Sequence, residues 1–103
     1  MTYFPDGWVL FKVTGNDPHY RVFGSWNSSY TTGSSWRINS GITKVTEDED
    51  YYYFTGFSNS VYKCSKETYG ELNSHSITAL HDLIEKPEVE SLHTIPENIM
   101  EIQ

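Results

Sequence analysis

The residues best suited to bind a ligand lie between Phe23 and Gly41, in the sequence FGSWNSSYTTGSSWRINSG. Tryptophan and tyrosine offer large flat surfaces, and serine, glycine and asparagine offer adaptable hydrogen bonds, a composition typical of evolved recognition loops. The rings could stack on a nucleobase, and the arginine could bind a phosphate. Backbone N–H groups of a loop rich in glycine and serine also bind phosphate. The predicted ligand-binding residues are Trp26, Tyr30, Ser34, Ser35, Trp36 and Arg37.

The two tryptophans of this stretch also have a structural interpretation, in which they belong to the core and the residues between them form an ordinary loop. Alternation along the preceding strand puts Trp26 on the inward face. Trp36 and Arg37 are neighbours in the next strand, so they should point to opposite faces and line one pocket only where the backbone is irregular. The binding hypothesis therefore depends most on Tyr30, on the backbone of residues 28–35 and on one of Trp36 and Arg37.

No other group of residues has the spacing of a catalytic or metal site. The four histidines and Cys64 form no Cys-x-x-Cys or His-x-x-x-His pair, so no zinc site is predicted. Cys64 lies in a strand pattern, which favours an inert buried thiol over a nucleophile. The four acids from Glu47 to Asp50 lack the spacing of a calcium-binding loop, and a solvated turn is expected there. We therefore predict no catalytic residue, no metal and no cofactor.

Charge and composition limit the classes of partner and compartment. The 103 residues suffice for one domain, and the net charge is −7. A chain this acidic lacks the basic footprint of a nucleic-acid-binding protein, so nucleic acid is not an expected partner. No apolar run nears the roughly 20 residues that span a bilayer, and the N-terminus lacks the basic region of a signal peptide. With one cysteine and no intrachain disulfide, a soluble cytoplasmic protein without a membrane partner is predicted.

Alternating apolar residues and frequent turn residues predict an antiparallel β-meander. Aromatic residues make up 16% of the chain, and together with β-branched residues they favour strands. In the first strand, the apolar set of Val9, Phe11 and Val13 is expected to face the core, with Trp8 and Leu10 on the other face. The predicted strands are 8–14, 19–26, 36–46 with a bend at Gly41, 51–57 and 61–64.

One helix is predicted over residues 77–86, with an apolar stripe that would lie on the sheet. Pro87 ends this helix because its ring cannot continue the hydrogen-bonding pattern. The remaining residues are polar and acidic with scattered apolar positions, and we expect them to be loosely ordered or to dock on another surface. The predicted fold class is α+β: an antiparallel sheet of about five strands with one covering helix in a domain of residues 1–86, followed by an acidic C-terminal extension, 87–103.

Residues 34–70, which include the phrases SWRINSGI and SVYKC, resemble small uncharacterised proteins of tailed bacteriophages. The resemblance covers about a third of the chain and carries no catalytic residue. It implies a protein in the cytoplasm of a host cell that binds and blocks a host component, such as a defence enzyme or its signalling molecule.

Two functions follow from these observations. The first is a non-catalytic binding protein that captures a small phosphorylated ligand, such as a nucleotide signal, in a pocket that a homo-oligomer could complete. The second is an inhibitor of a host defence enzyme that docks through its acidic or aromatic surface, with carboxylates in place of nucleic-acid phosphates. A structural component of the virion is a further alternative, and no acid–base or nucleophile constellation supports an enzyme.

Overall fold

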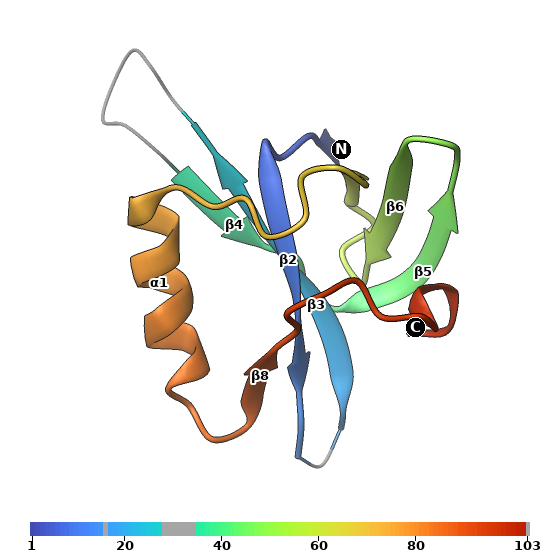
Figure 1. Ribbon diagram of the computed structural model, residues 1–103. Helices are drawn as coiled ribbons and strands as arrows, with labels where there is room; N and C mark the ends of the chain where they lie inside the picture. The colour runs from blue at the N-terminus through green and yellow to red at the C-terminus, as the bar shows by residue number, and fades with distance from the viewer. Residues whose placement is uncertain (16, 28–34, 103) are drawn as a thin grey trace.

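The computed structural model describes residues 1–15, 17–27 and 35–102. Two four-stranded β-sheets and one α-helix form an α+β fold, with the helix on one side of the molecule (Figure 1). The α+β class is confirmed, but the described strands form two four-stranded sheets instead of the predicted single sheet of about five strands. No helix in the described ranges is long and apolar enough to cross a membrane.

Each sheet has its own strand order, and the two share no strand. Sheet 1 contains β1 (Thr2–Tyr3), β7 (Val61–Ser65), β6 (Tyr51–Gly56) and β5 (Ile42–Glu47), in that order. Sheet 2 contains β4 (Ser35–Ile38), β3 (His19–Trp26), β2 (Gly7–Val13) and β8 (Val89–Ser91), in that order. Neighbouring strands are antiparallel, except that β1 pairs with β7 in parallel. The helical elements are α1 (Ser74–Ile84) and a short 3₁₀ helix, η1 (Ile99–Glu101).

The strand predicted over residues 36–46 is two strands in different sheets. β4 ends at Ile38 and β5 begins at Ile42, and Gly41 between them has a φ of 119°. Side chains strongly disfavour this backbone conformation, so glycine allows the chain to leave one sheet and enter the other. Asn39 fixes the corner, because its N–H donates to the Val22 carbonyl and its side-chain oxygen accepts from the Val22 N–H. The predicted bend is therefore a complete change of sheet.

β2 lies between two hydrophobic cores, and both of its faces are buried. Trp8 and Leu10 belong to the core between the sheets, while Val9 and Phe11 pack towards α1 and its residue Leu80. The alternation along this strand was predicted, but the prediction that only one face is inward is wrong. A strand covered by layers on both faces carries a continuous apolar run, because neither face meets water.

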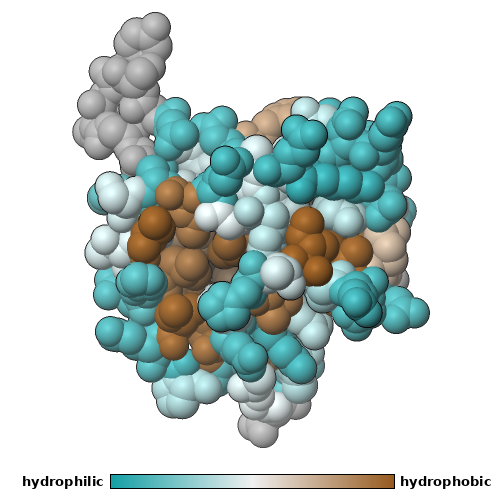
Figure 2. All heavy atoms as spheres, in the orientation of Figure 1, coloured by the Kyte–Doolittle hydropathy of each residue, from teal (hydrophilic) through white to brown (hydrophobic). Residues whose placement is uncertain are grey.

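The C-terminal residues, expected to be loosely ordered or to dock on another surface, complete a sheet and a core of the fold. β8 pairs with β2 over three residues, and the side chains of Ile99 and Ile102 are buried in the core between the sheets. α1 itself begins at Ser74, where the side chain of Asn73 caps it by accepting from the Ser76 N–H. Hydrophobic residues are visible at the surface between α1 and β2 (Figure 2).

Candidate functional site

An open hollow of about 450 Å³ lies where the edge strands β1 and β4 of the two sheets approach each other. Four of the six predicted binding residues line it: Trp26, Ser35, Trp36 and Arg37. The N-terminal segment adds Thr2, Tyr3 and Phe4. The other two predicted residues, Tyr30 and Ser34, lie outside the described residues. The structure thus gathers predicted residues from two strands with a segment that the sequence did not single out.

Trp36 and Arg37 line the same hollow although they have different contacts on the two sides of β4. The Trp36 ring stacks on Phe23, with 5.5 Å between ring centres and 11° between planes, and Phe23 belongs to the core under α1. The guanidinium carbon of Arg37 lies 4.6 Å from the centre of the Tyr3 ring, on the side of sheet 1. β4 lies at the edge of its sheet and pairs only with β3 in the described sheet order. Because no described strand covers its other side, residues from both faces of β4 can line one hollow. The prediction that these residues need an irregular backbone to share a pocket is wrong, because it did not consider an edge strand.

Aromatic rings form much of the lining. Tyr3 contacts Trp26 edge to face, with ring centres 6.3 Å apart, and also contacts the buried Tyr62. Trp26 is half-buried and packs on the core between the sheets, as alternation predicts, yet it also lines the hollow. Trp36 and Phe4 are 44% and 58% exposed, which leaves part of each ring open to solvent. The hollow therefore offers flat surfaces on which a planar group could stack.

Arg37 is the single charged residue among the described residues that line the hollow. Those described include every lysine, arginine, aspartate and glutamate of the chain, and one ion pair occurs among them, between Lys66 and Glu47 at 3.4 Å. Arg37 therefore has no carboxylate partner there, and its N–H donors remain suited to the bidentate binding of a phosphate.

The segment before β2 was missed in the sequence because it has no local pattern. β1 contains two residues, and its partner β7 is far away in the chain and parallel to it. Alternation needs several residues to become visible, so a strand this short cannot be recognised from its own residues. The nearest signal was the pair of aromatic residues Tyr3 and Phe4 directly before a proline.

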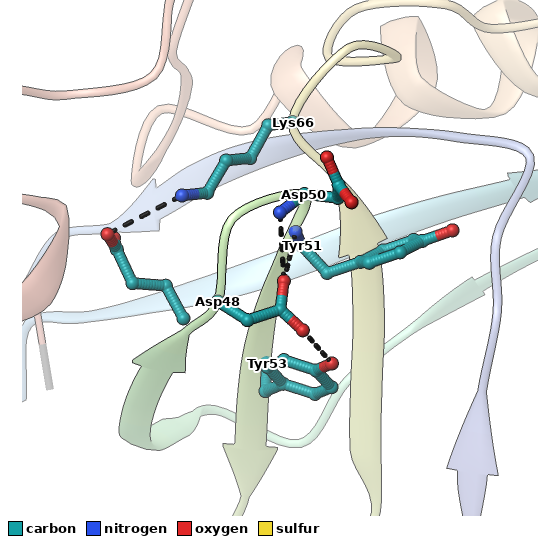
Figure 3. A network of polar contacts seen from close by, with 6 residues as sticks. Asp48, Asp50, Tyr51, Tyr53 and Lys66 are labelled. Atoms are coloured by element: carbon teal, nitrogen blue, oxygen red, sulfur yellow. Dashed lines mark hydrogen bonds and ion pairs between the residues drawn. The ribbon is translucent and has the colours of Figure 1, made fainter.

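The acidic turn after β5 forms a network of its own (Figure 3). The Asp48 carboxylate accepts hydrogen bonds from the N–H groups of Asp50 and Tyr51 and from the Tyr53 hydroxyl. The hydroxyl bond, followed by the Tyr51 N–H bond, holds the pKa of Asp48 below its usual value, and the same carboxylate raises the pKa of Tyr53. These hydrogen bonds stabilise the turn, because the Asp48 carboxylate bonds to backbone N–H groups of its own turn. The turn therefore needs no bound ligand to explain its acidic residues.

Other groups in the described ranges offer little chemistry. Burial raises the pKa of the Cys64 thiol well above its usual value, which disfavours the reactive thiolate. No cluster of three or more histidine, cysteine, aspartate or glutamate side chains there could hold a metal ion. The hollow beside Trp36 and Arg37 is therefore the site with the clearest chemical character.

Three comparisons with known proteins give the same result. No family model, no curated protein and no solved structure matches the chain.

Proposed function

We propose that this chain is a non-catalytic binding protein that captures a small phosphorylated ligand with a planar ring, such as a nucleotide. The observation that carries the proposal is the pair of adjacent residues Trp36 and Arg37. One offers a partly open indole, the other offers a guanidinium that has no carboxylate partner among the described residues, and both line one hollow. The ring of the ligand stacks on Trp36, and the phosphate accepts hydrogen bonds from Arg37.

Magnitudes indicate that both contacts are needed. Stacking of a base on an aromatic side chain contributes about 1–3 kcal/mol. A hydrogen bond to a charged group contributes about 1.5–3 kcal/mol. Because a dissociation constant of about 1 mM already corresponds to about 4 kcal/mol, neither contact alone gives useful affinity. Binding should therefore disappear when either residue is removed.

The bacteriophage resemblance of residues 34–70 suggests a biological setting for such capture. A phage protein that withdraws a nucleotide signal from the cytoplasm of its host would block a defence system without any chemical step. Affinity and abundance are sufficient for that task, so the proposal requires no general acid, base or nucleophile. The described lining of the hollow fits this requirement, since the cationic group in it is an arginine that stays charged.

The test is a calorimetric titration of the four common nucleoside 5′-monophosphates into the protein at low salt. Trp36→Ala and Arg37→Ala should each weaken binding at least ten-fold. Two matched controls should bind as the unaltered protein does: Phe57→Ala, which removes a 68% exposed aromatic outside the hollow, and Lys44→Ala, which removes an exposed cation on β5. Absence of binding to all four nucleotides, or site variants that bind normally, would overturn the proposal.

The same titration needs a check on folding, because Trp36 also stacks on Phe23. Loss of an aromatic pair costs about 0.5–1.5 kcal/mol beyond area burial. In a domain of this size that corresponds to a fall in Tm of several degrees, with the protein still folded at 25 °C. Trp36→Phe should recover most of the Tm and part of the binding.

A further inference from the structure

A second cluster of aromatic rings around a cation begins at the rim of the hollow. Phe4 lines the hollow, and the Lys63 ammonium lies 5.5 Å from the centre of its ring. The same ammonium lies 4.4 Å from the centre of the Tyr51 ring and 5.8 Å from that of Tyr53. We call Phe4, Tyr51, Tyr53 and Lys63 the Lys63 cluster. Its cation comes from β7 of sheet 1, whereas Arg37 comes from β4 of sheet 2.

The Lys63 cluster lies on the outer face of sheet 1. The neighbours of Lys63 along β7, Tyr62 and Cys64, point into the core, so alternation sends the lysine to the opposite face. On the adjacent β6, Phe54 is buried in that core, while Tyr51 and Tyr53 are only half-buried. The cluster therefore forms an accessible surface of rings and a cation that continues from the hollow through Phe4.

No carboxylate of the described residues forms an ion pair with Lys63. The Asp48 carboxylate senses the charge of Lys63, but it already accepts three hydrogen bonds from its own turn and from Tyr53. A cation–π contact at an exposed site contributes about 0.5–1 kcal/mol and uses none of the donors that an ammonium needs for an anion. Lys63 thus keeps capacity to bind a phosphate.

We propose that the ligand of the hollow is a dinucleotide, with one base and phosphate at Trp36 and Arg37 and the second at Phe4 and Lys63. This inference rests on the function proposed above and specifies its ligand. Two sets of ring and cation, joined through Phe4, match two bases that are joined through a phosphate. A mononucleotide would leave the second set unused.

The charge of the chain limits the length of the ligand. Each phosphate of a dinucleotide can meet one of the two cations, Arg37 and Lys63. A longer strand would place further phosphates against a body of net charge −7. Affinity for single strands grows with the number of phosphates that meet basic groups, and Arg37 and Lys63 can meet two.

The test compares adenosine 5′-monophosphate with the dinucleotide pApA by calorimetry at low salt. The dinucleotide should bind the unaltered protein at least ten-fold more tightly. Lys63→Gln should bring its affinity within about three-fold of that of the mononucleotide. Lys44→Gln, which removes the same charge from an exposed position on β5, should change neither affinity. Phe4→Leu provides a second variant that removes the shared ring and should also remove the dinucleotide advantage.

The outcomes separate this inference from the proposed function. Equal binding of both ligands to the unaltered protein would overturn the dinucleotide inference and leave nucleotide capture intact. Binding of a twelve-residue oligoadenylate more than ten-fold tighter than pApA would also overturn it, because the site would then extend beyond two cations. Absence of binding to either ligand would overturn both proposals.

Discussion

The guanidinium of Arg37 lies over the ring of Tyr3, with 4.6 Å between its carbon and the ring centre, and this contact joins the edges of the two sheets. Tyr3 belongs to β1 and Arg37 to β4, the outermost strands of their sheets. A cation–π contact of this kind contributes about 0.5–1 kcal/mol at an exposed site. It holds the guanidinium beside the hollow without using its N–H donors, which is the property that a phosphate site requires.

Arg37→Lys separates the charge of this side chain from its shape. Lysine keeps the positive charge but loses the planar fork that binds a phosphate through two hydrogen bonds. We expect nucleotide affinity to fall about three- to ten-fold, less than in Arg37→Ala, with little change in Tm. Calorimetric titration and a thermal melt measure both quantities. Equal affinity of the lysine variant would show that the phosphate does not use the fork.

Asp48→Asn tests the acidic turn through the pH dependence of stability. Hydrogen bonds from the Tyr53 hydroxyl and the Tyr51 N–H hold the pKa of Asp48 below its ordinary value of 3.8. A carboxyl with a lowered folded-state pKa stabilises the fold above its unfolded pKa, and this contribution disappears as the pH falls through the folded value. The variant should therefore be less stable than the unaltered protein at pH 7, and the difference should shrink below about pH 4.

Urea unfolding at pH 7, 4 and 3 measures that difference. Asp50→Asn is the matched control, because it removes an exposed acid from the same turn while leaving its own N–H bond to Asp48 in place. It should change the free energy of unfolding little at any pH. A difference for Asp48→Asn that stays constant from pH 7 to pH 3 would contradict the role given to the Asp48 bonds.

Tyr62 should govern stability at alkaline pH. Burial raises the pKa of this phenol to about 12, with a partly opposing effect of the nearby Arg37 charge. The unfolded chain loses the proton near pH 10 and the folded chain near pH 12, so the stabilisation is complete below pH 10 and is lost as the pH rises between these values. Tyr62→Phe should therefore lose less stability between pH 10 and pH 12 in denaturant titrations. If the free energy of unfolding of the variant fell with pH as steeply as that of the unaltered protein, a group other than Tyr62 would account for the loss.

Ile99→Ala should show that the C-terminal segment belongs to the fold. Its side chain is buried between the sheets, and truncation of such a residue costs about 2–5 kcal/mol. Met100→Ala, one residue away and partly exposed, should cost much less when both variants are unfolded in denaturant. Equal, small effects would mean that the segment does not pack as described. Deletion of residues 87–103 would remove core residues together with acidic residues. Glu97→Gln and Glu101→Gln remove acidic charge from this segment and keep its core residues.

The sequence predicts some elements well because their signals are local. The bounds of β3 agree with the prediction of 19–26, since alternation there is bracketed by a proline turn before it and a polar stretch after it. The sequence predicts a bend at Gly41 where the structure breaks between β4 and β5, because a glycine in a strand pattern is compatible with a bend and with a change of sheet. Which sheet a strand enters depends on contacts between distant residues, and these leave no trace in a local pattern.

The candidate site shows the same division. The chemical suitability of Trp26, Trp36 and Arg37 was visible in their types and spacing. Their meeting with Tyr3 was not, because it depends on the parallel pairing of β1 with β7 and on the position of β4 at a sheet edge. Alternation assigned correct sides to neighbouring residues, but it could not tell that both sides of an edge strand border one hollow.

The most direct test of nucleotide capture is a ¹⁵N–¹H NMR titration that follows the three tryptophan indole N–H signals. Trp8 is buried, and its indole N–H donates to the Ser65 carbonyl at 2.7 Å, so it serves as an internal reference. Trp26 and Trp36 line the hollow. We predict that adenosine 5′-monophosphate shifts the signals of Trp36 and Trp26 in a saturable way and leaves that of Trp8 in place, and that Arg37→Ala removes these shifts. Signals of Trp26 and Trp36 that stay unmoved at millimolar nucleotide would contradict the proposed site.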